Sequence, residues 1–119
     1  MSDPLLNLIA DYKPFDEMER LHIKQLRQFL KESDNPYDRS NLLGHVVADA
    51  WIVNPKRTHV VLVEHGLGKL WMAPGGHCDG NPDVLKTTIR ETEEETGLKN
   101  LTTLINGKVF DINVGTVPT

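Results

Sequence analysis

Hydrophobic positions recur at a helical spacing over residues 16–32, with basic residues between them. Asp16 stands directly before this pattern as an N-cap, so we expect a helix that runs to about Glu32. The apolar positions are Met18, Leu21, Ile23, Leu26, Phe29 and Leu30. A basic amphipathic helix can contact a membrane or a partner, but more often it packs on its own domain. A short apolar patch at residues 5–9 precedes it, and the turn-rich residues 33–41 follow it as a connector.

The pattern changes to that of β-strands from His45 onward. Residues 45–53 and 59–65 are strand-like, and the second run is apolar and β-branched, which predicts a central strand. Turns are expected at 54–58 and 66–69, and further short strands at 101–105 and 108–114. His45 and His59 are interpreted as ordinary residues at strand ends. The mixture predicts an α+β fold, with an N-terminal helical extension at 1–40 and one domain at 41–119.

A double glycine, Gly75-Gly76, leads into a second helix. Asn81 suits the N-cap, Pro82 the first helical position, and Asp83 the positive end of the helix dipole. Gly97 is expected to end this helix.

Glutamates gather on one face of this second helix, where Glu91, Glu94 and Glu95 follow the spacing i, i+3, i+4. The opposite face is expected to pack on the core, through Leu85, Ile89, Thr92 and Thr96. Grouped carboxylates repel unless a cation lies among them, and hard oxygen ligands suit Mg²⁺ or Mn²⁺. A solvated acidic face is the commoner explanation for a glutamate-rich helix, but the glycine pair upstream favours a metal site.

The segment from Gly76 to Leu98 resembles the Nudix box. That pattern is Gly, five residues, Glu, seven residues, then Arg-Glu-(apolar)-x-Glu-Glu-x-Gly-(apolar). The positions that match in register are Gly76, Arg90, Glu91, Glu94, Glu95, Gly97 and Leu98. Pro82 replaces the first glutamate, and Thr92 replaces the apolar residue. The missing glutamate normally helps to hold the arginine, so its task passes to Asp79 or Asp83, or is lost.

The resemblance implies the Nudix fold, an α/β/α sandwich with a mixed β-sheet between helices. It also implies a metal-dependent pyrophosphohydrolase that cleaves a nucleoside diphosphate linked to another moiety by water attack at phosphorus. Because that fold normally continues through further elements, we expect the domain to be incomplete at its C terminus. Two alternatives stay open, namely a nucleotide-binding domain without activity and, as a distant third, an isoprenoid diphosphate isomerase.

The resemblance also implies roles for individual residues. Glu94 and Glu95 would be metal ligands with the Gly76 carbonyl, and Glu91 would be a ligand or the base that orients water. Arg90 would hold the glutamates through charge-assisted hydrogen bonds. Gly75, Gly76 and His77 would contact the substrate. Glu93 is interpreted as a surface residue, being one step off the metal face.

Composition narrows the partners. The net charge of −4 argues against a basic nucleic-acid-binding surface, which leaves capped or 5′-phosphorylated RNA as the only nucleic acid considered. The single cysteine, Cys78, cannot form an internal disulfide and fits a reducing compartment. With no Cys-x-x-Cys partner, His77-Cys78 is not expected to bind zinc. No segment resembles a signal peptide or a membrane span, so we expect a cytoplasmic protein with a nucleotide-type substrate; a homodimer is left open.

Overall fold

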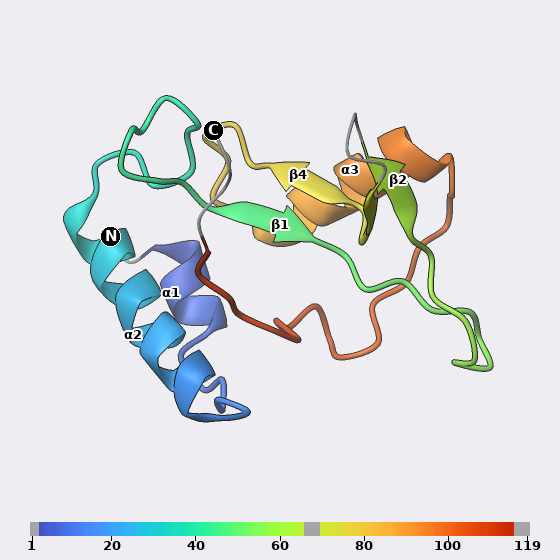
Figure 1. Ribbon diagram of the computed structural model, residues 1–119, viewed down its shortest axis with the longest axis horizontal. Helices are drawn as coiled ribbons and strands as arrows, with labels where there is room; N and C mark the ends of the chain where they lie inside the picture. Colours follow the sequence, from blue (N-terminus) through green and yellow to red (C-terminus); the bar gives the residue numbers. More distant parts are fainter. Residues whose placement is uncertain (1–2, 66–69, 116–119) are drawn as a thin grey trace.

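Helices and short antiparallel strands make up the computed structural model, which describes residues 3–65 and 70–115 (Figure 1). The expected α+β class is confirmed. The elements in chain order are α1 (Pro4–Leu8), α2 (Glu17–Glu32), β1 (Val47–Asp49), β2 (Val63–His65), β3 (Leu70–Met72), β4 (Gly75–His77) and α3 (Val84–Thr96).

The expected helix at the N-terminal side is confirmed as α2. Its N-cap is Asp16, whose carboxylate accepts a hydrogen bond of 2.8 Å from the backbone N–H of Glu19. Ile23 and Leu30 are buried on its inner face. The short helix α1 has no periodic signal in the sequence. It forms because Asp3 caps it, accepting hydrogen bonds from the N–H groups of Leu5 and Leu6, with a proline at its start.

The described strands form two separate antiparallel pairs rather than one mixed sheet: β1 with β4, and β2 with β3. Each strand has three residues, so the expected strands at 45–53 and 59–65 are much shorter than predicted. Among the described strands β2 has only β3 as a neighbour, and the prediction of a central strand was wrong. The turn expected at 54–58 forms, and the one at 66–69 lies outside the described residues.

Asn54 gives a physical reason for the shortened strands. Its side-chain oxygen accepts hydrogen bonds from the backbone N–H groups of Thr58, at 2.9 Å, and His59, at 3.0 Å. The N–H of His59 would otherwise pair with the backbone carbonyl of Asn54, so a local side chain competes with the strand ladder at this point. One isolated bridge, between Val53 and Val60, is formed beside this turn.

The segment after α3 was predicted to form strands at 101–105 and 108–114, and the structure contradicts this, because residues 100–115 hold no strand. Instead the chain turns at Asn106 and Gly107, both with positive φ, and runs back to the N-terminal helices (Figure 1). There the N–H of Ile112 donates to the carboxylate of Glu19 at 3.2 Å. Contacts with side chains replace the expected strand pairing.

The box helix begins two residues later than predicted. Asp83 is the N-cap of α3, accepting a hydrogen bond of 3.1 Å from the N–H of Lys86, and Asn81 instead accepts from the N–H of Asp83. The prediction that Gly97 ends the helix is confirmed, with φ of 74°. Thr92 is fully buried as expected, and Thr87 is also buried. The other three expected core residues, Leu85, Ile89 and Thr96, are partly buried.

One cluster of buried side chains joins the parts of the chain. Its members come from α1 and its C-cap, from α2 and the connector after it, from β1, from the loop after β4 and from the C-terminal segment: Leu5, Ile9, Ile23, Leu30, Tyr37, Ala48, Cys78 and Ile112. Helix α3 packs on β1 and β4 (Figure 1). This packing brings Glu91 against Gly76. The proposed boundary between residues 40 and 41 stays a prediction.

Candidate active site

The glycine pair lies between β1 and α3 and is shaped by both. Gly75 is paired with Asp49, and Gly76 with Ala48. A Cβ atom on Gly76 would lie 2.7 Å from Cδ of Glu91 and 2.9 Å from each of its carboxylate oxygens. The carboxylate of Glu91 therefore rests directly on the Gly76 backbone, a closeness that only glycine allows.

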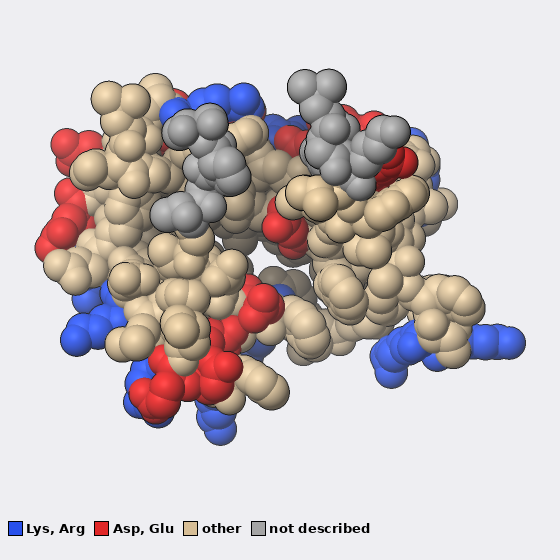
Figure 2. Space-filling view, in the orientation of Figure 1, with Lys and Arg blue, Asp and Glu red and all other residues tan. Residues whose placement is uncertain are grey.

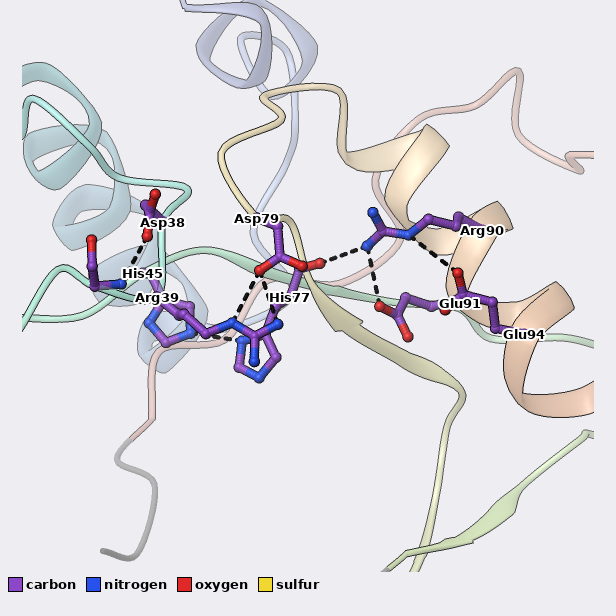
Figure 3. A network of polar contacts seen from close by, with 9 residues as sticks. Asp38, Arg39, His45, His77, Asp79, Arg90, Glu91 and Glu94 are labelled. Atoms are coloured by element: carbon purple, nitrogen blue, oxygen red, sulfur yellow. Dashed lines mark hydrogen bonds and ion pairs between the residues drawn. The ribbon is translucent and has the colours of Figure 1, made fainter.

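Arg90 links this loop to the helix. Its Nη2 donates hydrogen bonds to the backbone carbonyl of His77, at 2.8 Å, and to Oε1 of Glu91, at 3.1 Å (Figure 3). Its Nε lies 4.0 Å from Oε1 of Glu94. The side chain of Glu91 is 18% exposed whereas that of Glu94 is 62% exposed. Arg90 thus contacts two of the three box glutamates, and Glu91 is the better fixed of the two.

Neither Asp79 nor Asp83 takes over the task of the missing box glutamate, which is to hold Arg90. Asp79 binds Arg39 instead, through hydrogen-bonded contacts of 3.0 and 2.9 Å, and Asp83 caps α3 (Figure 3). Arg90 is held by the carbonyl oxygen of His77, a main-chain atom that no side-chain pattern reveals. A backbone acceptor therefore supports the arginine where the family pattern has a carboxylate.

The box carboxylates have the chemistry of ligands for a divalent cation. They are hard oxygen donors on one face of α3, and Glu91 adjoins the backbone of Gly76, so the donor chemistry fits Mg²⁺ or Mn²⁺. In residues 3–65 and 70–115, however, no three ligand-type side chains converge closely enough to enclose an ion. Glu91 is engaged by Arg90 and Glu94 extends toward solvent. The predicted ligands share a helix face but do not converge.

His45, which was interpreted from the sequence as an ordinary residue at a strand end, lies against His77. Nε2 of His45 is 2.9 Å from Nδ1 of His77, and the two ring planes are inclined by 29° with centroids 5.0 Å apart (Figure 3). The register explains the contact: Val47 is opposite His77, so His45 is its diagonal neighbour on the same face. Only the pairing of β1 with β4 could have revealed it, because 32 residues separate the two histidines.

Cys78 follows His77 and is buried, with 1% of its surface exposed. Burial raises the pKa of its thiol, which disfavours the thiolate needed of a nucleophile or a zinc ligand. Cys78 belongs to the core cluster, so its role here is packing beneath the loop.

Comparison with known proteins decides the family. A family model described as NUDIX domain matches residues 43–114, more than half of the chain. The chain belongs to the Nudix family. A relative from Lactococcus lactis subsp. cremoris (strain MG1363), "Probable DHNTP pyrophosphohydrolase", is 29% identical over 120 residues, which cover 99% of this chain and 68% of the relative. The protein is accordingly a hydrolase that acts on phosphoric anhydride bonds.

The Nudix match contains β1 to β4, α3 and the returning C-terminal segment, while α1 and α2 lie outside it. Nudix hydrolases generally need divalent metal ions, in keeping with the oxygen donors of α3.

Acidic and basic side chains both occur on the face shown in Figure 2. None of the helices in the described ranges is long and apolar enough to cross a bilayer. A cytoplasmic location stays a prediction.

Proposed function

We propose that this Nudix hydrolase cleaves a nucleoside diphosphate linked to another moiety. Water attacks one phosphorus, the bridging oxygen leaves with the second product, and the proton lost by water passes to a base. The observation that carries the proposal is the contact of Glu91 with Gly76, fixed by Arg90, in the register of the box. It supports a site in which a carboxylate of the helix and the backbone of the loop act together.

The residues that would hold the ion are Glu91, Glu94, Glu95 and the carbonyl of Gly76, with Mg²⁺ as the expected ion and Mn²⁺ as a substitute. A bound divalent ion supplies neutralisation of the charge that develops on the phosphoryl oxygens. Glu94 has the freedom to act as a ligand because its side chain is mostly exposed and because its Oε1 lies as far as 4.0 Å from Arg90 Nε, at the limit of an ion pair. Glu91 is either a further ligand or the base that orients water.

Arg90 contributes by position. A guanidinium that binds the His77 carbonyl and the Glu91 carboxylate at once ties β4 to α3 across the site. Gly75, Gly76 and His77 line the substrate phosphates in this proposal: the glycines contribute their backbone, and the imidazole supplies a hydrogen-bond donor.

The substrate is narrowed by the relative's printed name, which places DHNTP first among the compounds to test. The experiment incubates the protein with Mg²⁺ or Mn²⁺ and a panel of DHNTP, nucleoside triphosphates, dinucleotides, nucleotide sugars and capped RNA. Release of phosphate or pyrophosphate is measured. We expect turnover of at least one member.

Matched variants locate the activity. Glu94→Gln and Glu95→Gln should each lower kcat/KM by about 10²- to 10³-fold, the scale on which electrostatic stabilisation of the transition state is lost. Glu93→Gln is the control, since Glu93 lies off the metal face and 3.9 Å from Lys99. Binding of a nucleotide without any turnover would favour the inactive binding domain instead. Conversion of an isoprenoid diphosphate to its isomer would favour the third hypothesis.

A further inference from the structure

The contact between His45 and His77 brings a residue from outside the Nudix box against a residue inside it. Nε2 of His45 and Nδ1 of His77 are 2.9 Å apart, a hydrogen-bond distance, and both side chains are half-buried. His77 ends β4 directly after the glycine pair, and His45 precedes β1 by two residues. In Figure 3 the two rings lie beside Arg39, and Arg90 approaches His77 from its main-chain carbonyl.

A hydrogen bond between two neutral imidazoles fixes where their protons are. If Nε2 of His45 donates, Nδ1 of His77 accepts, and the one ring proton of His77 must be on Nε2. If His77 donates through Nδ1, its Nε2 is a bare acceptor. Phosphate oxygens accept hydrogen bonds, so only the first arrangement lets His77 donate to a substrate phosphate.

We propose that His45 is a positioning residue that holds His77 in the Nε2–H form, ready to donate to a phosphate oxygen of the substrate. The inference rests on the proposed function, because that function places His77 at the substrate phosphates. It adds His45, a residue outside the box, to the site, and it specifies that the ring proton of His77 is on Nε2.

The surroundings keep both histidines in place. The N–H of Val46, next to His45, donates to the carbonyl of Pro36 at 2.7 Å, and the carbonyl of His77 accepts from Arg90 at 2.8 Å. The neighbouring Arg39 and Asp79 neutralise one another. His77 is thus fixed at its main chain by Arg90 and at its ring by His45, which lowers the entropy lost when it binds substrate.

The kinetic test compares two replacements of His45 in the full-length protein. His45→Leu removes the donor, whereas His45→Gln offers an amide N–H at a similar reach. We expect the leucine variant to raise KM by about three- to tenfold with little change in kcat, the scale of one lost hydrogen bond, and the glutamine variant to restore most of it. Equal KM values in the parent and the leucine variant would overturn the proposal. Should the leucine variant not fold, His45→Asn replaces it, because asparagine is one methylene shorter than glutamine.

The spectroscopic test does not need a substrate. Long-range ¹H–¹⁵N correlation spectra of the parent should show His77 protonated at Nε2 alone. The Nδ1 resonance of His77 should shift in the His45→Leu variant, because the hydrogen bond that Nδ1 accepts is lost. A parent His77 protonated at Nδ1 would overturn the inference. The two proposals fail separately: a parent that hydrolyses no compound of the panel contradicts the proposed function, while the tautomer of His77 still decides the role of His45.

Discussion

The carboxylate of Glu91 occupies the space that any side chain at Gly76 would need. Its Cδ lies 2.7 Å from the position of a Cβ built on Gly76, well inside van der Waals contact. The neighbouring glycine is crowded differently, since a Cβ on Gly75 would lie 2.5 Å from the backbone carbonyl oxygen of Ala48. One glycine therefore makes room for a flexible carboxylate, and the other for a paired strand.

This difference predicts opposite outcomes for two similar changes. Gly76→Ala should displace the carboxylate of Glu91, which is the end of a flexible side chain, and lower kcat/KM by at least about tenfold with little change in melting temperature. Gly75→Ala should lower the melting temperature instead, because the strand β1 must move. Gly115→Ala is the control, since its added Cβ would meet only Nδ2 of Asn113 at 3.9 Å. Full activity of Gly76→Ala would contradict the assigned role of this contact.

Thr92 gives a prediction about stability. It stands where the family pattern has an apolar residue, it is 0% exposed, and its hydroxyl has no hydrogen-bond partner among the described residues. Thr92→Val should therefore raise the free energy of unfolding by about 1 kcal/mol, by removing a buried polar group at nearly constant volume. Urea titration measures the change. Thr96→Val should show the reverse, because the Thr96 hydroxyl donates to the Thr92 carbonyl at 2.6 Å, and equal stability of the two variants would argue against this reasoning.

The contact between Glu19 and Asp111 predicts how stability changes with pH. The hydrogen bond to Glu19 raises the pKa of Asp111, followed by burial as a cause. Burial alone would raise the pKa of Glu19, but hydrogen bonds from Phe15, Ile112 and Tyr12 lower it. Asp111 therefore contributes stability that is present below its unfolded pKa and is lost as pH rises through its folded pKa. Glu19 contributes stability that is present above its unfolded pKa and is lost as pH falls through its folded pKa.

Asp111→Asn tests this pair, because the asparagine beside Glu19 stays uncharged at every pH. The variant should be more stable than the parent at pH 7. The difference should be smaller at pH 4, because the raised pKa of Asp111 favours its protonated form as pH falls. Thermal unfolding at both pH values measures it. Asp34→Asn removes the same charge at an exposed position and serves as the control. A destabilised Asp111→Asn variant at pH 7 would contradict the sign of the shift.

The sequence was most informative where local rules decide the outcome. Capping chemistry fixes the start of α2 at Asp16 and the end of α3 at Gly97, and the box register placed Arg90 beside Glu91 and Glu94. It was least informative where distant groups compete for backbone donors. The N–H of Ile112 binds Glu19, 93 residues away, instead of joining a strand.

In the candidate site, too, local spacing predicted some of the residue positions, and distant contacts determined the others. Helical spacing puts Glu91 and Glu94 on one face, but the acceptor that holds Arg90 is the main-chain carbonyl of His77, which has no sequence signature. The partner of the His77 ring, His45, depends on strand register and could not be derived from spacing along the chain.

The most direct test of the central account is the binding of Mn²⁺, followed by electron paramagnetic resonance or by water-proton relaxation. If the carboxylates of α3 and the Gly76 backbone form the metal site, the parent binds Mn²⁺, Glu94→Gln weakens binding by at least about tenfold, and Glu93→Gln does not. Equal Mn²⁺ affinity in the parent and in Glu94→Gln would contradict the account.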